Sequence, residues 1–276
     1  MKHLLLVVIF VAQGVAQQRA AELNSILMES TFRIHAPKKD SITQTSFGTA
    51  FLMGKPVPDD PTKLYYVLVS AKHVFDGFAG DVAFLLLRDP KGDGSYTTRL
   101  WSIAIRDKGI DLYVKHPTED VAVLYVNMPD EMKVTILPTS FLATDEMLTK
   151  YEIHPGDELL CLGFPLLVSS PYGFPILRSG KIASYPLTPT KLIKRILFDF
   201  NVFEGNSGGP VYFIDRNRAF GGQTFLGNTI QFVIGVESAQ LQAAAYGLQT
   251  IGVAQIVPSP FIIETLALMP ANSPYK

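Results

Sequence analysis

The residues with the clearest chemical potential lie near the end of the chain, in the octapeptide Phe-Glu-Gly-Asn-Ser-Gly-Gly-Pro at 203–210. Ser207 stands between glycines, and Gly205 and Gly208 can take backbone conformations that are closed to residues with a Cβ atom. Consecutive N–H groups can therefore converge beside the serine oxygen and bind a developing negative charge. The alternative is a glycine-rich hairpin, although tight turns seldom need a serine at their centre. The segment predicts a nucleophilic serine, which requires a general base elsewhere in the chain.

The order of the candidate residues excludes one class of serine enzyme. A Gly-x-Ser-x-Gly elbow also occurs in α/β-hydrolases, where the acid and the histidine follow the serine. In this chain every histidine precedes Ser207; they are His3, His35, His73, His116 and His154. The order that remains is histidine, acid, serine.

His73 is the histidine best placed to act as the base. The run Tyr-Tyr-Val-Leu-Val-Ser at 65–70 is apolar and rich in β-formers, which indicates a buried strand. Ala-Lys-His-Val follows at 71–74, so His73 stands where a rigid strand ends. A catalytic imidazole needs such a support because its ring must be held in a fixed orientation. For the other four histidines we expect structural or solvent-facing roles.

Asp120 is the acid predicted by the same reasoning. The polar turn His-Pro-Thr-Glu-Asp at 116–120 opens onto the apolar run Val-Ala-Val-Leu-Tyr-Val at 121–126. A carboxylate at the mouth of a buried strand can reach an imidazole, and the carboxylate of a triad is usually buried. Glu119, Asp111 and Asp76 lie in more polar stretches, so we expect them to be solvated.

Four segments, in this order, resemble a known family. They are Ser-Phe-Gly-Thr-Ala-Phe-Leu at 46–52, Val-Ser-Ala-Lys-His-Val at 69–74, Asp-Val-Ala-Val-Leu at 120–124 and Gly-Asn-Ser-Gly-Gly-Pro at 205–210. Together they look like the signature stretches of trypsin-like serine peptidases, in particular the bacterial branch with HtrA-type and glutamyl-endopeptidase-like enzymes. The likeness covers about residues 27 to 269.

The resemblance implies an all-β fold of two antiparallel Greek-key β-barrels, with the active site in the cleft between them and a short C-terminal helix. It implies a serine endopeptidase with a triad of His73, Asp120 and Ser207, and an oxyanion hole made by the backbone N–H groups of Gly205 and Ser207. The expected partner is a polypeptide substrate, and no cofactor or metal is expected.

The same resemblance assigns a substrate pocket. Its lining residues are expected to be Asn201, Glu237, Ser238, Gln240 and Gly252. Asn201 is neutral, which argues against a trypsin-like aspartate at the pocket floor. Glu237 leaves two interpretations open, a preference for basic or polar side chains before the scissile bond or a solvated carboxylate at a strand end.

Activation is expected to differ from that of the digestive enzymes. There an aspartate before the nucleophile pairs with a newly cut N-terminus, whereas Asn206 stands at this position here. We therefore expect activity without zymogen cleavage. No PDZ module is expected either, because the closing helix is followed only by a short tail. The alternative function is a catalytically silent protein- or peptide-binding module on the same fold, because a motif shows capability and not turnover.

Composition is typical of a packed globular β protein. The chain has 276 residues, of which 47% are hydrophobic and 18% charged. The formal net charge of −1 gives no indication of nucleic-acid binding. Short β-rich runs separated by Gly, Pro, Asn and Asp turns favour an antiparallel barrel or sandwich over an α/β fold.

The first residues have the pattern of an export signal. Lys2 and His3 precede an apolar stretch at 4–12 that is too short to span a membrane, and Gly-Val-Ala at 14–16 suits a signal peptidase. We expect cleavage after Ala16 and a periplasmic or secreted protein without stable membrane insertion; an uncleaved anchor is the alternative. The single cysteine, Cys161, cannot form an internal disulfide and is expected to be buried and inert.

These patterns divide the chain into six parts. We expect a signal peptide at 1–16, an N-terminal segment at 17–29, an N-terminal barrel at 30–137, a connector at 138–155, a C-terminal barrel at 156–258, and a helix and tail at 259–276. The expected strands are 30–36, 47–53, 65–70, 83–88, 102–105 and 121–126 in the first barrel, and 156–164, 176–183, 195–200, 210–213, 229–237 and 250–256 in the second.

Overall fold

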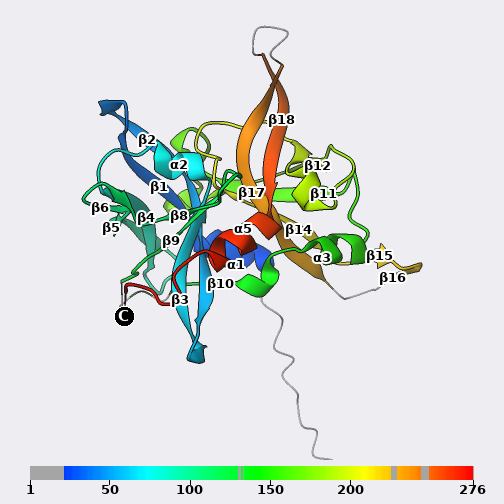
Figure 1. Cartoon of the computed structure of the whole chain (residues 1–276), viewed down its shortest axis with the longest axis horizontal. Helices are drawn as coiled ribbons and strands as arrows, with labels where there is room; N and C mark the ends of the chain where they lie inside the picture. The colour runs from blue at the N-terminus through cyan, green and yellow to red at the C-terminus, as the bar shows by residue number, and fades with distance from the viewer. Residues whose placement is uncertain (1–21, 130–131, 133, 225–228, 244–248, 276) are drawn as a thin grey trace, which may run out of the picture.

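The computed structural model describes residues 22–275 except 130, 131, 133, 225–228 and 244–248 (Figure 1). The expected signal peptide at 1–16 lies outside the described residues. The described chain is mostly antiparallel β structure with a few short helices. None of the helices within these bounds is long and apolar enough to cross a bilayer.

Strands of the first half form one sheet with the path β5-β4-β1-β2-β3-β9-β8, and β10 pairs with β2 beside this path. Their bounds are β1 (Thr31–Lys38), β2 (Ser41–Val57), β3 (Asp60–Ser70), β4 (Val82–Pro90), β5 (Tyr96–Ala104), β8 (Val114–Lys115), β9 (Ala122–Tyr125) and β10 (Leu137–Pro138). A small hairpin of β6 (Arg106–Asp107) and β7 (Ile110–Asp111) is separate from it. The path has two ends, at β5 and β8, whereas the sequence predicted a closed barrel here. β8 has only two residues and offers few backbone groups for a further strand.

The second half forms a closed barrel with the strand order β11-β12-β13-β18-β17-β14. Its strands are β11 (Glu158–Gly163), β12 (Ile176–Ile182), β13 (Ile196–Asp199), β14 (Pro210–Asp215), β17 (Ile230–Ala243) and β18 (Gln249–Pro258), with a hairpin of β15 (Ala219–Phe220) and β16 (Gln223–Thr224) beside them. Neighbouring strands of the barrel are antiparallel, which confirms the prediction for this half. β17 and β18 project together beyond the body of the molecule (Figure 1).

Short helices connect and cover the sheets. They are α1 (Leu23–Ser30), α2 (Lys72–Asp76), η1 (Thr139–Phe141), α3 (Asp145–Lys150), η2 (Pro165–Leu167), η3 (Pro171–Gly173), α4 (Thr190–Ile193) and α5 (Ser259–Ala267). The predicted C-terminal helix is confirmed as α5. Its residues Phe261, Ile262 and Leu266 are buried in the core of the first half, so this helix ties the end of the chain back to the N-terminal sheet.

The two halves share apolar packing. One buried cluster contains the core of the N-terminal sheet and also Tyr212, Val233, Val236 and Val257 from barrel strands. A second cluster fills the interior of the closed barrel. The shared cluster fixes the position of one half against the other, because close-packed interiors tolerate little displacement.

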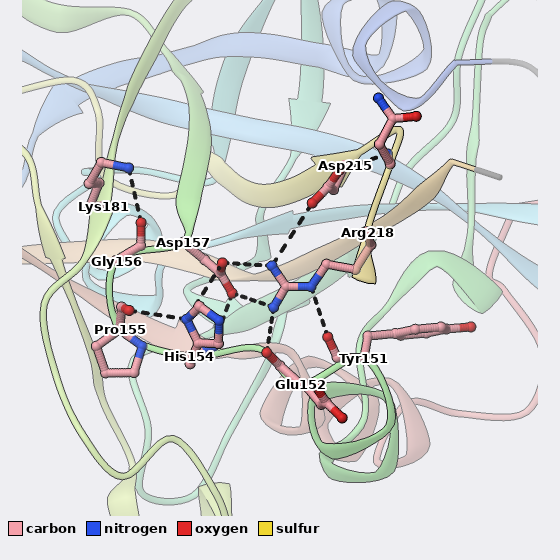
Figure 2. A network of polar contacts seen from close by, with 10 residues as sticks. Tyr151, Glu152, His154, Pro155, Gly156, Asp157, Lys181, Asp215 and Arg218 are labelled. Atoms are coloured by element: carbon pink, nitrogen blue, oxygen red, sulfur yellow. Dashed lines mark hydrogen bonds and ion pairs between the residues drawn. The ribbon is translucent and has the colours of Figure 1, made fainter. Parts of the chain in front are cut away.

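A polar network surrounds Arg218, which lies between β14 and β15 (Figure 2). The Arg218 guanidinium forms a two-point ion pair with Asp157, with N–O distances of 2.6 and 2.8 Å. It also donates to the carbonyl oxygens of Tyr151 and Glu152. Arg218 and Asp157 are both buried, and this pairing satisfies two charges that would otherwise be costly in the interior.

Candidate active site

His73 and Asp120 come from two neighbouring strands of the N-terminal sheet. β3 ends at Ser70, and His73 lies in the first turn of α2, directly after that strand. Asp120 lies in the turn between β8 and β9. β3 and β9 are antiparallel neighbours with Ser70 opposite Ala122, so the end of one strand meets the start of the other. This pairing brings the two residues together.

The Asp120 carboxylate binds His73 at two points. His73 Nδ1 lies 2.7 Å from Asp120 Oδ2, and the backbone N–H of His73 donates to Oδ1 at 2.9 Å. A third contact comes from the C-terminal half, where Ser238 Oγ donates to Oδ2 at 2.5 Å. Two fixed contacts to one residue hold the imidazole ring in one orientation.

The electrostatics of this pair decide which ring nitrogen is the base. Partial burial raises the pKa of Asp120, but the bonds from the His73 ring, the Ser238 hydroxyl and the His73 amide together lower it to about 2. Asp120 is therefore ionised at neutral pH and can only accept, so His73 Nδ1 carries the proton. The lone pair of a neutral ring is then on Nε2. The His73 side chain is 49% exposed, so the ring is not enclosed by the protein.

Ser207 lies in a turn that two glycines make possible. Gly205 has φ +97° and Gly208 has φ +88°, a region that residues with a Cβ atom rarely adopt. There is also no room for a side chain at Gly208, because a Cβ atom there would lie 2.0 Å from the Thr49 carbonyl oxygen. The turn is attached to β2 through Thr49, whose amide donates to the Ser207 carbonyl oxygen at 2.8 Å. Both predicted glycine positions therefore need glycine.

The backbone N–H groups of this turn fall into two sets. Those of Asn206 and Gly208 donate to the carbonyl oxygens of Phe203 and Glu237. Those of Gly205 and Ser207 have no acceptor among the residues that the structure describes. The carbonyl oxygen of residue 204 accepts from the amide of residue 166 at 2.7 Å, and a trans peptide directs the Gly205 N–H to the opposite side. The two donors predicted to bind an oxyanion are thus unengaged.

Ser238 connects the serine to the acid. Ser207 Oγ donates to the Ser238 carbonyl oxygen at 3.3 Å, while the Ser238 hydroxyl donates to Asp120. The structure thus brings Ser207 and Asp120 to one residue of β17, and Ser207 Oγ has this bond rather than one to His73. Sequence reasoning placed Ser238 in the pocket and missed its contact with the acid, for which the sequence holds no local signal.

The prediction that Glu119 is solvated is wrong. Its side chain is 3% exposed and forms an ion pair with Arg195 and a longer contact of 3.6 Å with Lys194. These two partners lie between α4 and β13, in the other half of the molecule. The adjacent His116 accepts at Nδ1 from the amides of Thr118 and Glu119, at 3.2 and 3.0 Å. The turn that carries the acid is therefore fixed from within and from across the interface.

The predicted pocket residues do not share one environment. Asn201 and Gly252 are neighbours, because a Cβ atom at Gly252 would lie 2.9 Å from Asn201 Oδ1. Arg178 of β12 joins them by donating to the Asn201 carbonyl oxygen at 2.7 Å, a neighbour that the sequence did not indicate. Gln240 pairs through its backbone with β18, and its side chain lies outside the described part of the structure.

Glu237 is not a solvated carboxylate at a strand end, and that interpretation is wrong. Its side chain is completely buried. Burial, reinforced by the negative charge of Asp120, raises the pKa of Glu237 to about 8. Asn206, directly before the nucleophile, is buried as well. Its side chain is a neutral amide.

The described residues contain no group of three or more His, Cys, Asp or Glu side chains that could hold a metal ion. Cys161 is free and buried, as predicted, and burial raises the pKa of its thiol well above the usual value. A thiol in this state is a poor nucleophile.

Comparisons with known proteins give structural matches only. No family model and no curated protein matches the sequence. The protease Anisep from Arthrobacter nicotinovorans is 13% identical with a TM-score of 0.49, covering 86% of this chain and 93% of its own. The thermostable serine protease AL20 from an extremophilic microorganism is 11% identical with a TM-score of 0.49, covering 87% and 96%. The Rv3671c protease from M. tuberculosis, in its active form, is 17% identical with a TM-score of 0.47, covering 92% and 86%.

Proposed function

We propose that this protein is a serine endopeptidase that hydrolyses peptide bonds through His73, Asp120 and Ser207. The observation that carries the proposal is the double contact of Asp120 with His73, at 2.7 and 2.9 Å, with Ser207 joined to the same carboxylate through Ser238. An orienting acid, a base and a hydroxyl around one point form the set that acyl transfer needs.

Each residue then has a defined task. Ser207 Oγ attacks the carbonyl carbon of the peptide while His73 Nε2 takes its proton, and Asp120 stabilises the imidazolium that forms. The N–H groups of Gly205 and Ser207 bind the oxyanion of the tetrahedral intermediate, and one such donor contributes about 10² to 10³ in rate. The intermediate collapses to an acyl-enzyme as His73 returns the proton to the leaving amine. Water, activated by the same base, then releases the acid.

Labelling of Ser207 by a fluorophosphonate tests the proposal. The folded protein should be labelled at one site, Ser207, and should cut an unfolded protein at internal bonds that mass spectrometry identifies. Ser207→Ala and His73→Ala should remove labelling and cleavage without loss of the fold, because both side chains are partly exposed. Ser170→Ala, a partly exposed serine outside the site, is the matched control and should be labelled like the natural protein.

The absence of labelling in a well-folded natural protein would favour the other function, a silent binding module on the same fold. Labelling that persists in Ser207→Ala would place the nucleophile elsewhere. The two results are distinguishable because the first leaves no modified serine and the second leaves one at another position.

The finer assignments belong to the same proposal. The place within the HtrA-type and glutamyl-endopeptidase-like branch rests on the four sequence segments. We propose export with cleavage after Ala16, so that N-terminal sequencing of the mature protein should begin at Gln17. A neutral Asn206 requires no ion pair with a new N-terminus, so protein that begins at residue 17 should be labelled without further cutting.

A further inference from the structure

Glu237 is a buried acid beside the nucleophile for which the proposed mechanism has no task. It lies opposite Ile256 of β18, whose side chain belongs to the interior of the barrel. Residues opposite each other on paired strands share a face of the sheet, so the Glu237 side chain points into the barrel. Its neighbour Val236 points the other way, into the core shared by the two halves. The carboxyl group is therefore enclosed.

The enclosed carboxyl group makes no hydrogen bond to the described residues. Glu237 has no exposed surface, and neither of its oxygens has a hydrogen-bond partner in the described part of the chain. A buried polar group in this state is costly unless a nearby group can satisfy it. Buried polar groups without a hydrogen bond are rare in folded proteins and are often found at functional sites.

The backbone keeps Glu237 next to the serine. The amide of Gly208 donates to the Glu237 carbonyl oxygen at 2.8 Å, and the amide of Glu237 donates to the Gly209 carbonyl oxygen at 2.9 Å. These two bonds join β17 to the turn directly after Ser207. The backbone of Glu237 therefore cannot move away from the nucleophile without breaking them.

Burial and several neighbouring side chains act on the pKa of the Glu237 carboxyl group. Burial is the largest influence and raises the pKa of Glu237, the Asp120 carboxylate raises it further, and the Ser207 hydroxyl lowers it by stabilising the ionised form. Cys161 of β11 is a close neighbour: burial raises the pKa of its thiol, the charge of Glu237 raises it further, and Arg178 lowers it. At neutral pH the acid is thus protonated, with the serine hydroxyl as the nearby donor able to satisfy its anion.

We propose that Glu237 is a positioning residue for Ser207: as a neutral acid it leaves the serine hydroxyl to His73, and as a carboxylate it accepts the Ser207 Oγ–H bond and withdraws that hydroxyl from the base. The proposal rests on the endopeptidase function proposed above. In the change of state, hydroxide removes one proton from Glu237, and no covalent bond of Ser207 is made or broken.

The carboxylate would also oppose catalysis through its charge. Asp120 already carries one negative charge, and a second anion beside Ser207 would raise the energy of the oxyanion that forms there. Capture of the hydroxyl and repulsion of the oxyanion act in the same direction. We therefore expect the reactivity of Ser207 to fall at alkaline pH, where a simple histidine base would keep it on a plateau.

The rate of fluorophosphonate labelling against pH, measured on the full protein between pH 5 and 10, tests this role. For the natural protein we expect a fall centred near pH 8, about tenfold per pH unit beyond it. Glu237→Gln keeps the shape of the side chain but cannot ionise. The labelling rate of this variant should therefore reach a plateau and stay there at alkaline pH. Cys161→Ala is the control, because this thiol is a titratable neighbour of Glu237 outside the proposed triad, and its curve should retain the alkaline fall.

An alkaline fall that persists in Glu237→Gln, or its absence from the natural protein, would overturn this role while labelling at neutral pH kept the proposed function. Absence of labelling at every pH would remove both. If Glu237→Gln does not fold, ¹³C NMR of the glutamate carboxyls in the natural protein replaces it. The buried carboxyl should titrate at the midpoint of the labelling curve, and a different midpoint would overturn the role.

Discussion

At the scale of single residues, the site depends on how many partners Asp120 has. Its carboxylate is held by three donors, two from His73 and one from Ser238. Hydrogen bonds to a charged group are roughly twice as strong as neutral ones, so each matters for the orientation of the base. Ser238 is the only one of these donors from the C-terminal half among the described contacts.

Ser238→Ala should lower kcat/KM by about tenfold, with most of the loss in kcat. The substitution removes one donor to a charged acceptor, worth about 1.5–3 kcal/mol, of which water recovers a part. The pKa of Asp120 should rise toward its ordinary value because one of the bonds that lowers it is lost. Steady-state kinetics with a peptide substrate measure the effect, with Ser170→Ala as control. Equal activity of the two variants would show that the Ser238 hydroxyl has no such role.

At the scale of elements, the turn between β8 and β9 is anchored by the opposite half of the molecule. Glu119, adjacent to Asp120, is 3% exposed and pairs with Arg195 next to β13. Removing Arg195 takes away the closer of the two cationic partners of the buried Glu119 carboxylate, which is more costly than losing an exposed pair. The Arg195 contact should therefore affect both stability and the position of Asp120.

Arg195→Gln should lower the free energy of unfolding by about 2–3 kcal/mol and reduce kcat by several-fold. Lys194→Gln is the matched control, because Lys194 contacts the same carboxylate but its side chain is 55% exposed. An exposed pair contributes less than about 1 kcal/mol, so this variant should be close to the natural protein. Urea unfolding and steady-state kinetics measure both effects, and equal losses in the two variants would contradict the anchoring role.

At the scale of the whole molecule, the contributions of two acids of the site to stability change with pH in opposite directions. Asp120 has a folded pKa of about 2, below its ordinary 3.8, so its contribution is present above pH 3.8 and is lost as the pH falls toward 2. Glu237 has a folded pKa of about 8, above its ordinary 4.5. Its contribution is full below pH 4.5 and is lost as the pH rises to 8, because the unfolded chain ionises first.

We therefore expect the free energy of unfolding to fall between pH 5 and pH 8, with a contribution from Glu237 of up to about 1.4 kcal/mol per pH unit. Glu237→Gln should remove this contribution and flatten the curve. Urea unfolding at several pH values in this range, on both proteins, measures the difference. Parallel curves would show that Glu237 is ionised in the folded protein.

Local patterns in the sequence were enough for much of the architecture. Apolar β-rich runs predicted the strands that became β3, β9 and β11, because alternation and residue type act over a few neighbours. The ends of strands were harder to predict from the sequence. β2 begins at Ser41, well before the predicted start at 47, because hairpin pairing with β1 extends it. The open path of the N-terminal sheet likewise depends on which strands meet, and no local pattern encodes that.

The sequence by itself determined which residues could do chemistry: a serine between glycines, and a histidine and an aspartate at the ends of apolar strands. Only the tertiary structure decided what surrounds them. It buried Glu119 against Arg195, enclosed Glu237 in the barrel, and brought Ser238 to Asp120 from 118 residues along the chain. Backbone conformation and strand propensity are set by near neighbours, whereas burial and ion pairing are set by whichever distant segments the fold places side by side.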